Sequence, residues 1–97
     1  MKPVLNRHVL RRVIFQAICN TSEYIREGTP DPIRRLLVEI NVQAVMDVLL
    51  NKNFRRDALQ YIHGEVCQAH CELIGTNNRA IAMIAEDLKN NATLRNR

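Results

Sequence analysis

Two prolines in the segment GTPDPIRR, Pro30 and Pro32, determine where a long helix of this chain can begin. Proline lacks the backbone N–H that a helix interior needs and clashes with the preceding turn, so no helix runs through both positions. Asp31 can cap a helix with its carboxylate, and proline suits the first helical position. The sequence therefore predicts a helix over about residues 32–51, with a separate helix before it.

Apolar residues that recur every three or four positions predict three more helices. The first covers about residues 5–27 and ends at Gly28, because glycine is favoured at helix C-termini. Another covers about 54–74, and the last covers about 77–90. The polar segment 91–97 is expected to fray. Short loops between these segments indicate a single all-α domain of 97 residues, a compact bundle of about four helices.

The composition excludes several classes of protein. Hydrophobic residues make up 46% of the chain and aromatic residues only 4%, which is typical of a folded domain with an aliphatic core. No run of about 18 apolar residues occurs, so we expect no membrane-spanning helix. Arg11 and Arg12 interrupt the apolar N-terminal run, which argues against a signal peptide. A domain of this size needs no disulfide, and three cysteines is an odd number, so the sequence predicts a cytoplasmic protein.

The second predicted helix is apolar on two opposite sides. One stripe consists of Ile33, Leu36, Leu37, Ile40, Ala44 and Val48. The other stripe consists of Val38, Val42, Val45 and Leu49. A helix that is apolar on both sides lies at the centre of its bundle or is shared with another subunit. Because only three other helices are available to cover it, we expect a homodimer or a tightly bound heteromer, with the second stripe at or near the contact.

Two histidines and two cysteines gather in the third predicted helix. They are His63, Cys67, His70 and Cys71, and they flank a predicted buried stripe of Leu59, Ile62, Val66, Ala69 and Leu73. Side chains four residues apart on a helix are neighbours and could share a metal ion, but one straight helix cannot surround an ion with four ligands. The alternative role is packing at the edge of the core, so we expect neither a metal nor a cofactor.

The segment 67–88 resembles a helix-turn-helix in outline. The spacing of small, turn and apolar positions in that motif is matched by Cys71, Gly75, Ile81 and Ile84. The resemblance implies a recognition helix that begins with Asn77, Asn78 and Arg79 and reads bases in the major groove. This helix carries two acidic residues and little positive charge. The alternative is an ordinary corner between two packed helices, so we keep a DNA-binding regulator as the second hypothesis.

No pattern of catalytic residues is evident. The chain lacks a Ser-His-Asp spacing, a glycine-rich phosphate loop and a pair of catalytic carboxylates, and a small helical domain leaves little room for a pocket. We therefore expect a binding protein and not an enzyme.

The net charge is +4, and eleven of the fourteen cationic residues are arginine. The guanidinium group binds carboxylates and phosphates with a planar pair of donors, which suits an acidic protein or a nucleic acid. Six arginines form three adjacent pairs: Arg11 and Arg12, Arg34 and Arg35, Arg55 and Arg56. Two pairs open a helix, where a cation opposes the helix dipole at a cost of a few tenths of a kcal/mol. We expect these arginines to bind the partner, or else to be solvated.

The leading hypothesis is a small accessory or regulatory protein that acts by binding a larger protein or protein complex. Its size and plain composition are typical of inhibitors and adaptors that phages and mobile elements encode.

Overall fold

The computed structural model describes residues 1–95 and confirms the all-α prediction, with five helices in place of about four. The helices are α1 (Arg7–Thr21), α2 (Pro32–Leu50), α3 (Arg55–Ile62), α4 (Glu65–Ile74) and α5 (Asn78–Asn91). A 3-10 turn, Lys52–Phe54, joins α2 to α3. No helix in the described part of the chain is long and apolar enough to cross a membrane.

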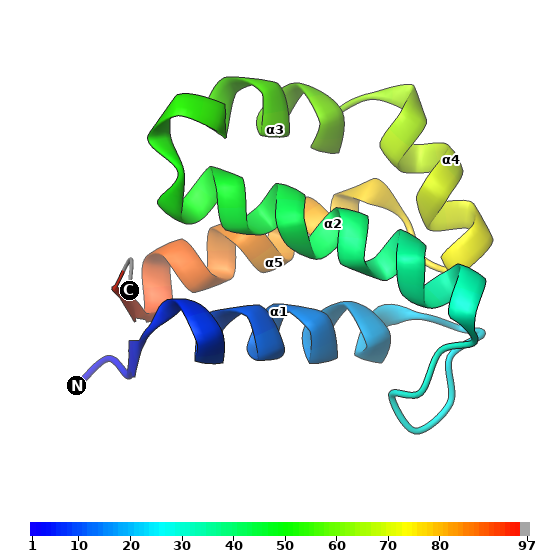
Figure 1. Ribbon diagram of the computed structural model, residues 1–97, viewed down its shortest axis with the longest axis horizontal. Coiled ribbons are helices and arrows are strands. Elements are labelled where there is room, and N and C mark those ends of the chain that lie inside the picture. Colours follow the sequence, from blue (N-terminus) through cyan, green and yellow to red (C-terminus); the bar gives the residue numbers. More distant parts are fainter. Residues whose placement is uncertain (96–97) are drawn as a thin grey trace.

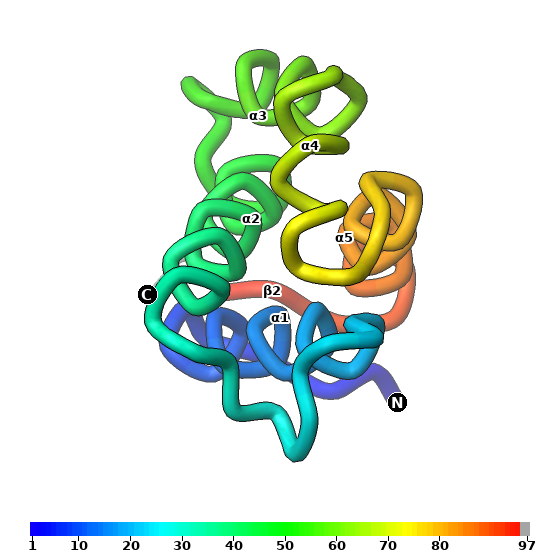
Figure 2. The backbone as a smooth tube through the Cα atoms, turned by 90° about the vertical axis from the view of Figure 1, so that its right-hand side faces the viewer, coloured from blue at the N-terminus to red at the C-terminus, as the bar shows by residue number. Residues whose placement is uncertain are grey.

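Helix α2 is the centre of the fold and contacts each of the four other α-helices. It lies between α1 on one side and α3 on the other, and α5 runs along its back (Figures 1 and 2). As the sequence predicts, Pro32 is its first residue, and the Asp31 carboxylate accepts a hydrogen bond from the Arg34 backbone N–H at 2.9 Å.

The first helix ends at Thr21, several residues before the predicted position. Ser22 ends it, because its hydroxyl accepts hydrogen bonds from the backbone N–H groups of Tyr24 and Ile25, both at 3.0 Å. The same hydroxyl donates to the carbonyl of Ile74, which ties the loop to α4. Serine competes in this way with the helical hydrogen bonds of the backbone. Gly28 keeps a positive φ of 70°, but it shapes the loop and does not cap the helix.

The predicted third helix is broken at Gly64, which produces α3 and α4. Gly64 is extended, with φ −104° and ψ 175°, and its N–H donates to the Tyr61 carbonyl at 3.0 Å. Glycine has a low helix propensity, so a bend there is inexpensive. The bend turns α4 so that Cys67 and Cys71 point into the core. The predicted buried stripe is therefore wrong apart from Ile62: Leu59, Val66, Ala69 and Leu73 are exposed.

The two ends of the described chain meet in a short parallel pair of strands, β1 (Val4–Leu5) and β2 (Thr93–Leu94). The backbone N–H of Thr93 donates to the Pro3 carbonyl at 2.8 Å, and that of Arg95 donates to the Leu5 carbonyl at 2.9 Å. The segment predicted to fray, 91–97, thus contains a strand, and its residues 96 and 97 lie outside the described residues.

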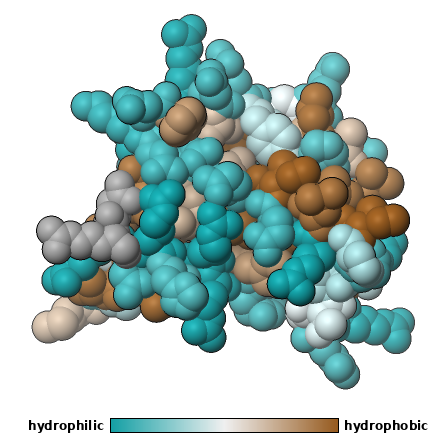
Figure 3. Space-filling model, in the orientation of Figure 1, coloured by the Kyte–Doolittle hydropathy of each residue, from teal (hydrophilic) through white to brown (hydrophobic). Residues whose placement is uncertain are grey.

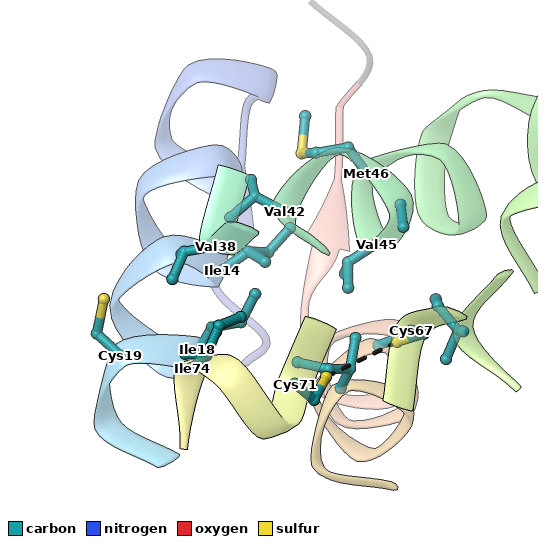
Figure 4. Close-up of a cluster of buried hydrophobic side chains, with 14 of the residues drawn as sticks. Ile14, Ile18, Cys19, Val38, Val42, Val45, Met46, Cys67, Cys71 and Ile74 are labelled. Atoms are coloured by element: carbon teal, nitrogen blue, oxygen red, sulfur yellow. Dashed lines mark hydrogen bonds between the residues drawn. The ribbon is translucent and has the colours of Figure 1, made fainter. Parts of the chain in front are cut away.

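The core identifies which side of α2 faces inward. Val38, Val42 and Val45 are all 0% exposed and lie among side chains of α1 and α4 (Figure 4). Residues of the other predicted stripe face outward at the start of α2, where Ile33 is 75% and Leu36 is 62% exposed. These three valines therefore cannot form the contact predicted for a homodimer, because α1, α4 and α5 already bury that side within one chain. The fourth predicted contact residue, Leu49, is half-buried.

Candidate functional site: a groove between α3 and α5

A groove of about 730 Å³ lies between α3 and α5, above the C-terminal half of α2. Its lining consists of Val48, Leu49, Arg55, Leu59, Ile62, His63, Asn78, Arg79, Ala82, Met83, Ala85, Glu86, Lys89 and Leu94. Ligand pockets in proteins occupy about 300–1,000 Å³, so the groove is large enough for a segment of another molecule.

The floor of the groove is apolar. Val48 and Leu49 reach it half-buried from α2, and Leu59 reaches it from α3. On the other side Met83 projects from α5 with 65% of its surface exposed. Methionine is flexible and polarisable, which suits surfaces that adapt to a partner. Apolar side chains gathered in one open groove are typical of a binding site.

The rim of the groove is mainly basic. Arg55, Arg79 and Lys89 line it, and Glu86 is the only acidic side chain in the lining that the structure describes. Arg55 also donates from Nε to the Val48 carbonyl at 2.8 Å. A cation is favourable there, because unpaired carbonyls give a helix C-terminus a partial negative charge. Arg55 therefore stabilises the C-terminal end of α2, although as a cation at the start of α3 it opposes the dipole of that helix.

The predicted arginine pairs do not assemble into one site, and the first member of each pair bonds within the chain. Arg11 donates to Gln43 and lies 3.6 Å from a Glu39 carboxylate oxygen. Arg34 pairs with Asp31 at 2.7 Å and donates to the Leu73 carbonyl at 3.2 Å.

The second members of the pairs, Arg12, Arg35 and Arg56, are exposed. Arg35 lies 6.0 Å from the centre of the Phe15 ring. Of the six predicted partner-binding arginines only Arg55 lines the groove, and Arg56 lies beside it on α3.

The helix–glycine–helix corner expected between the last two helices is present. Gly75 has a φ of 89°, and the N–H of Thr76 donates to the Cys71 carbonyl at 2.9 Å, which closes the end of α4. Glycine is required there, because a Cβ would lie 2.7 Å from the Tyr24 ring. Ile81 is buried on the α5 side of the corner.

The start of α5 has fewer groups available for contacts with DNA than the helix-turn-helix resemblance implies. The Asn77 side chain caps the helix by accepting from the Ala80 N–H at 2.9 Å, so its oxygen is not free to read a base. Arg79 is exposed, but Glu86 and Asp87 are exposed on the same helix. Carboxylates repel the phosphate backbone on which the affinity of DNA-binding proteins depends. Asn78 and Arg79 line the groove instead.

The cysteines and histidines of the described chain form no metal site. The Sγ atoms of Cys67 and Cys71 are 3.8 Å apart and fully buried (Figure 4), and His63 lies apart from them at the end of α3. No group of three His, Cys, Asp or Glu residues among residues 1–95 could hold a metal ion. The hydrogen bond with Cys67 and burial both raise the pKa of the Cys71 thiol. A thiol with a raised pKa is a poor nucleophile and a poor metal ligand.

These cysteines belong to a small polar cluster inside the core. Asn41, which is fully buried, donates to the Leu37 carbonyl at 2.9 Å and accepts from the Cys67 thiol and the Tyr61 hydroxyl, both at 3.3 Å. The Tyr61 oxygen is also 3.0 Å from His70 Nδ1. Burial raises the pKa of Tyr61, so the phenol stays neutral. The cluster satisfies its own hydrogen bonds, which indicates a structural role.

Reasoning from the sequence missed Met83 and Lys89 as site residues. The one available signal was Met83 itself, an apolar residue of the last predicted helix that does not match the apolar positions Ile81 and Ile84 of the helix-turn-helix resemblance. No protein-family model, curated protein or solved structure matches this chain.

Proposed function

We propose that the protein is a small helical accessory protein, an inhibitor or adaptor, that binds a larger protein by holding an acidic amphipathic helix in the α3–α5 groove. The single observation that carries the proposal is the pairing of an apolar floor with a basic rim. Met83 and Leu59 would contact the apolar stripe of the bound helix. Arg55, Arg79 and Lys89 would meet carboxylates along its edges.

Recognition of this kind uses general properties of helices. An amphipathic helix presents apolar residues at positions i, i+3, i+4 and i+7, which fit a groove between two helices. The energy comes mainly from a few buried anchors, and charges at the rim mostly affect specificity and the rate of association. Met83 supplies the exposed apolar anchor on this chain, and the three cations favour an acidic partner over a basic one.

The apolar floor and basic rim of the groove suit the binding of a partner helix. His63 is the only histidine in its lining, and it has no described hydrogen-bond partner that would orient it as a base. The three cysteines are free and buried, which fits a protein that works in a reducing cytoplasm. An origin in a phage or mobile element remains part of this proposal, because it accords with a small accessory protein.

A selection experiment tests the proposal even while the partner is unidentified. A displayed library of helical peptides would have fixed apolar residues at i, i+3, i+4 and i+7 and random residues elsewhere. We expect selected peptides to be rich in Asp and Glu, to bind more weakly as salt rises, and to be lost on Met83→Glu. Enrichment of basic peptides, or equal recovery by the Met83→Glu variant, would contradict the proposal.

Duplex DNA serves as the second arm of the test. Wild type, Met83→Glu and an Asn78→Ala/Arg79→Ala variant are titrated with duplex DNA at two salt concentrations. We expect weak binding without sequence preference. Sequence-selective binding that disappears only in the Asn78→Ala/Arg79→Ala variant would show that the helix-turn-helix hypothesis is the right one.

A further inference from the structure

An apolar surface at the start of α2, outside the lining of the groove, has no covering element. It consists of Ile33, Leu36 and Ile40 from the first half of α2, together with Leu73 from the end of α4. The bond from Arg34 Nε to the Leu73 carbonyl holds the two helices together there. Figure 3 shows this surface as a continuous hydrophobic area where α2 begins beside α4. Exposed apolar patches of this kind mark interaction sites.

The charges beside this surface have both signs and are ordered along α2. Arg35 and Glu39 lie one turn apart on the flank that faces α1, so they are neighbours on the helix. Arg35 is in no ion pair that the described residues form. Glu39 has only the long contact with Arg11, at 3.6 Å, with both side chains 39% exposed. The flank therefore keeps one cation and one anion available to a partner.

We propose that a second copy of this chain packs on this surface, with the two α2 helices antiparallel and a twofold axis near Leu37. A twofold axis of this kind brings the same flank of each helix together in opposite directions. Arg35 lies two residues before Leu37 and Glu39 lies two residues after it. Each Arg35 would then meet Glu39 of the second copy. Ile33 would meet Ile40 of the second copy, and Leu36 would lie close to the axis.

The charge pattern selects this arrangement over its competitors. A parallel pair with its twofold axis along the helices would set this charged flank against the Ile33 and Ile40 flank of the second copy, which leaves Arg35 and Glu39 unpaired. An acidic peptide would satisfy Arg35 and be repelled by Glu39. Only a partner with the opposite order of charges satisfies both, and an antiparallel second copy has that order. This dimer leaves the α3–α5 groove open, so it is independent of the proposed function.

Sedimentation over a range of concentrations tests the association. We expect a reversible monomer–dimer equilibrium for wild type. Leu36→Glu should weaken the dimer by at least about a hundredfold, because each copy would bury an unpaired carboxylate. Circular dichroism should be unchanged, since Leu36 is exposed in the monomer. Met83→Glu, which places the same charge in the groove, is the matched control and should dimerise normally. A wild-type protein that stays monomeric at the highest concentration, or a dimer that Leu36→Glu leaves intact, would overturn the proposal.

Cysteine cross-linking tests the register. An Ile33→Cys chain mixed with an Ile40→Cys chain should form the mixed disulfide in preference to either symmetric one. The native cysteines do not interfere, because all three are buried. Symmetric disulfides at both positions with little mixed product would indicate a parallel pair and overturn the antiparallel arrangement.

Discussion

Val42→Ala tests which face of α2 points into the core. Val42 is 0% exposed, so the substitution removes two buried carbon atoms. At about 0.8 kcal/mol for each buried methylene, the lost transfer energy is about 1.6 kcal/mol. A cavity of roughly 45 Å³ adds about 1 kcal/mol, since cavities cost about 24 cal/mol per Å³. We therefore expect the free energy of unfolding to fall by about 2.5 kcal/mol.

The assay is thermal and urea unfolding followed by circular dichroism. The unfolding entropy of a domain of this length is about 0.2 kcal/mol per degree, so Tm should fall by about 12 °C. Val66→Ala is the matched control, because it removes the same atoms from a side chain that is 60% exposed. We expect its effect to lie within about 0.5 kcal/mol. Equal losses for the two variants, or a loss below about 1 kcal/mol for Val42→Ala, would refute the assignment of the inner face.

Two further predictions concern pH and the corner before α5. Hydrogen bonds from the Arg34 backbone and side chain lower the pKa of Asp31 below its ordinary value of 3.8. The stability that the Asp31 carboxylate contributes is therefore fully present above about pH 3.8 and is lost as the pH falls through the lowered pKa. Burial raises the pKa of Tyr61 above its ordinary value of 10.0, so stability should fall as pH rises above about 10. Urea unfolding at a series of pH values measures both effects, and a flat profile at both ends would contradict this. Gly75→Ala should lower the free energy of unfolding by at least about 1 kcal/mol, because the residue has a positive φ and its Cβ would meet the Tyr24 ring. Denaturant unfolding that matches wild type would show that the loop can move away at no cost.

The start of α2 could be predicted from the sequence because it depends on local chemistry. Asp31 and Pro32 need no distant contact to begin a helix, and the structure confirms both positions. Gly75 is a similar case, since its left-handed conformation follows from residues next to it.

The inner face of α2 could not be predicted in this way. Periodicity locates two apolar stripes, but which stripe is inside depends on where α1, α4 and α5 pack. Val38 and Leu36 are both apolar, and only the tertiary arrangement buries one and exposes the other. The break at Gly64 was missed for a related reason, because apolar spacing continues across it at Ile62 and Val66.

The groove could not be predicted from the sequence. It joins Arg55 on α3 with Arg79 and Lys89 on α5, and no local pattern brings such distant residues together. Arginine pairs were a weak guide, since Arg11 and Arg34 bond within the chain.

The most direct test of the groove is the affinity of one selected acidic helix for three proteins: wild type, Met83→Glu and Leu36→Glu. Fluorescence titration at low protein concentration gives each dissociation constant without interference from self-association. We predict that Met83→Glu weakens binding by at least about thirtyfold, because a carboxylate would be buried among apolar and acidic groups. Leu36→Glu should leave the affinity within about twofold, since Leu36 does not line the groove. Loss of binding in Leu36→Glu, with Met83→Glu unaffected, would contradict the account.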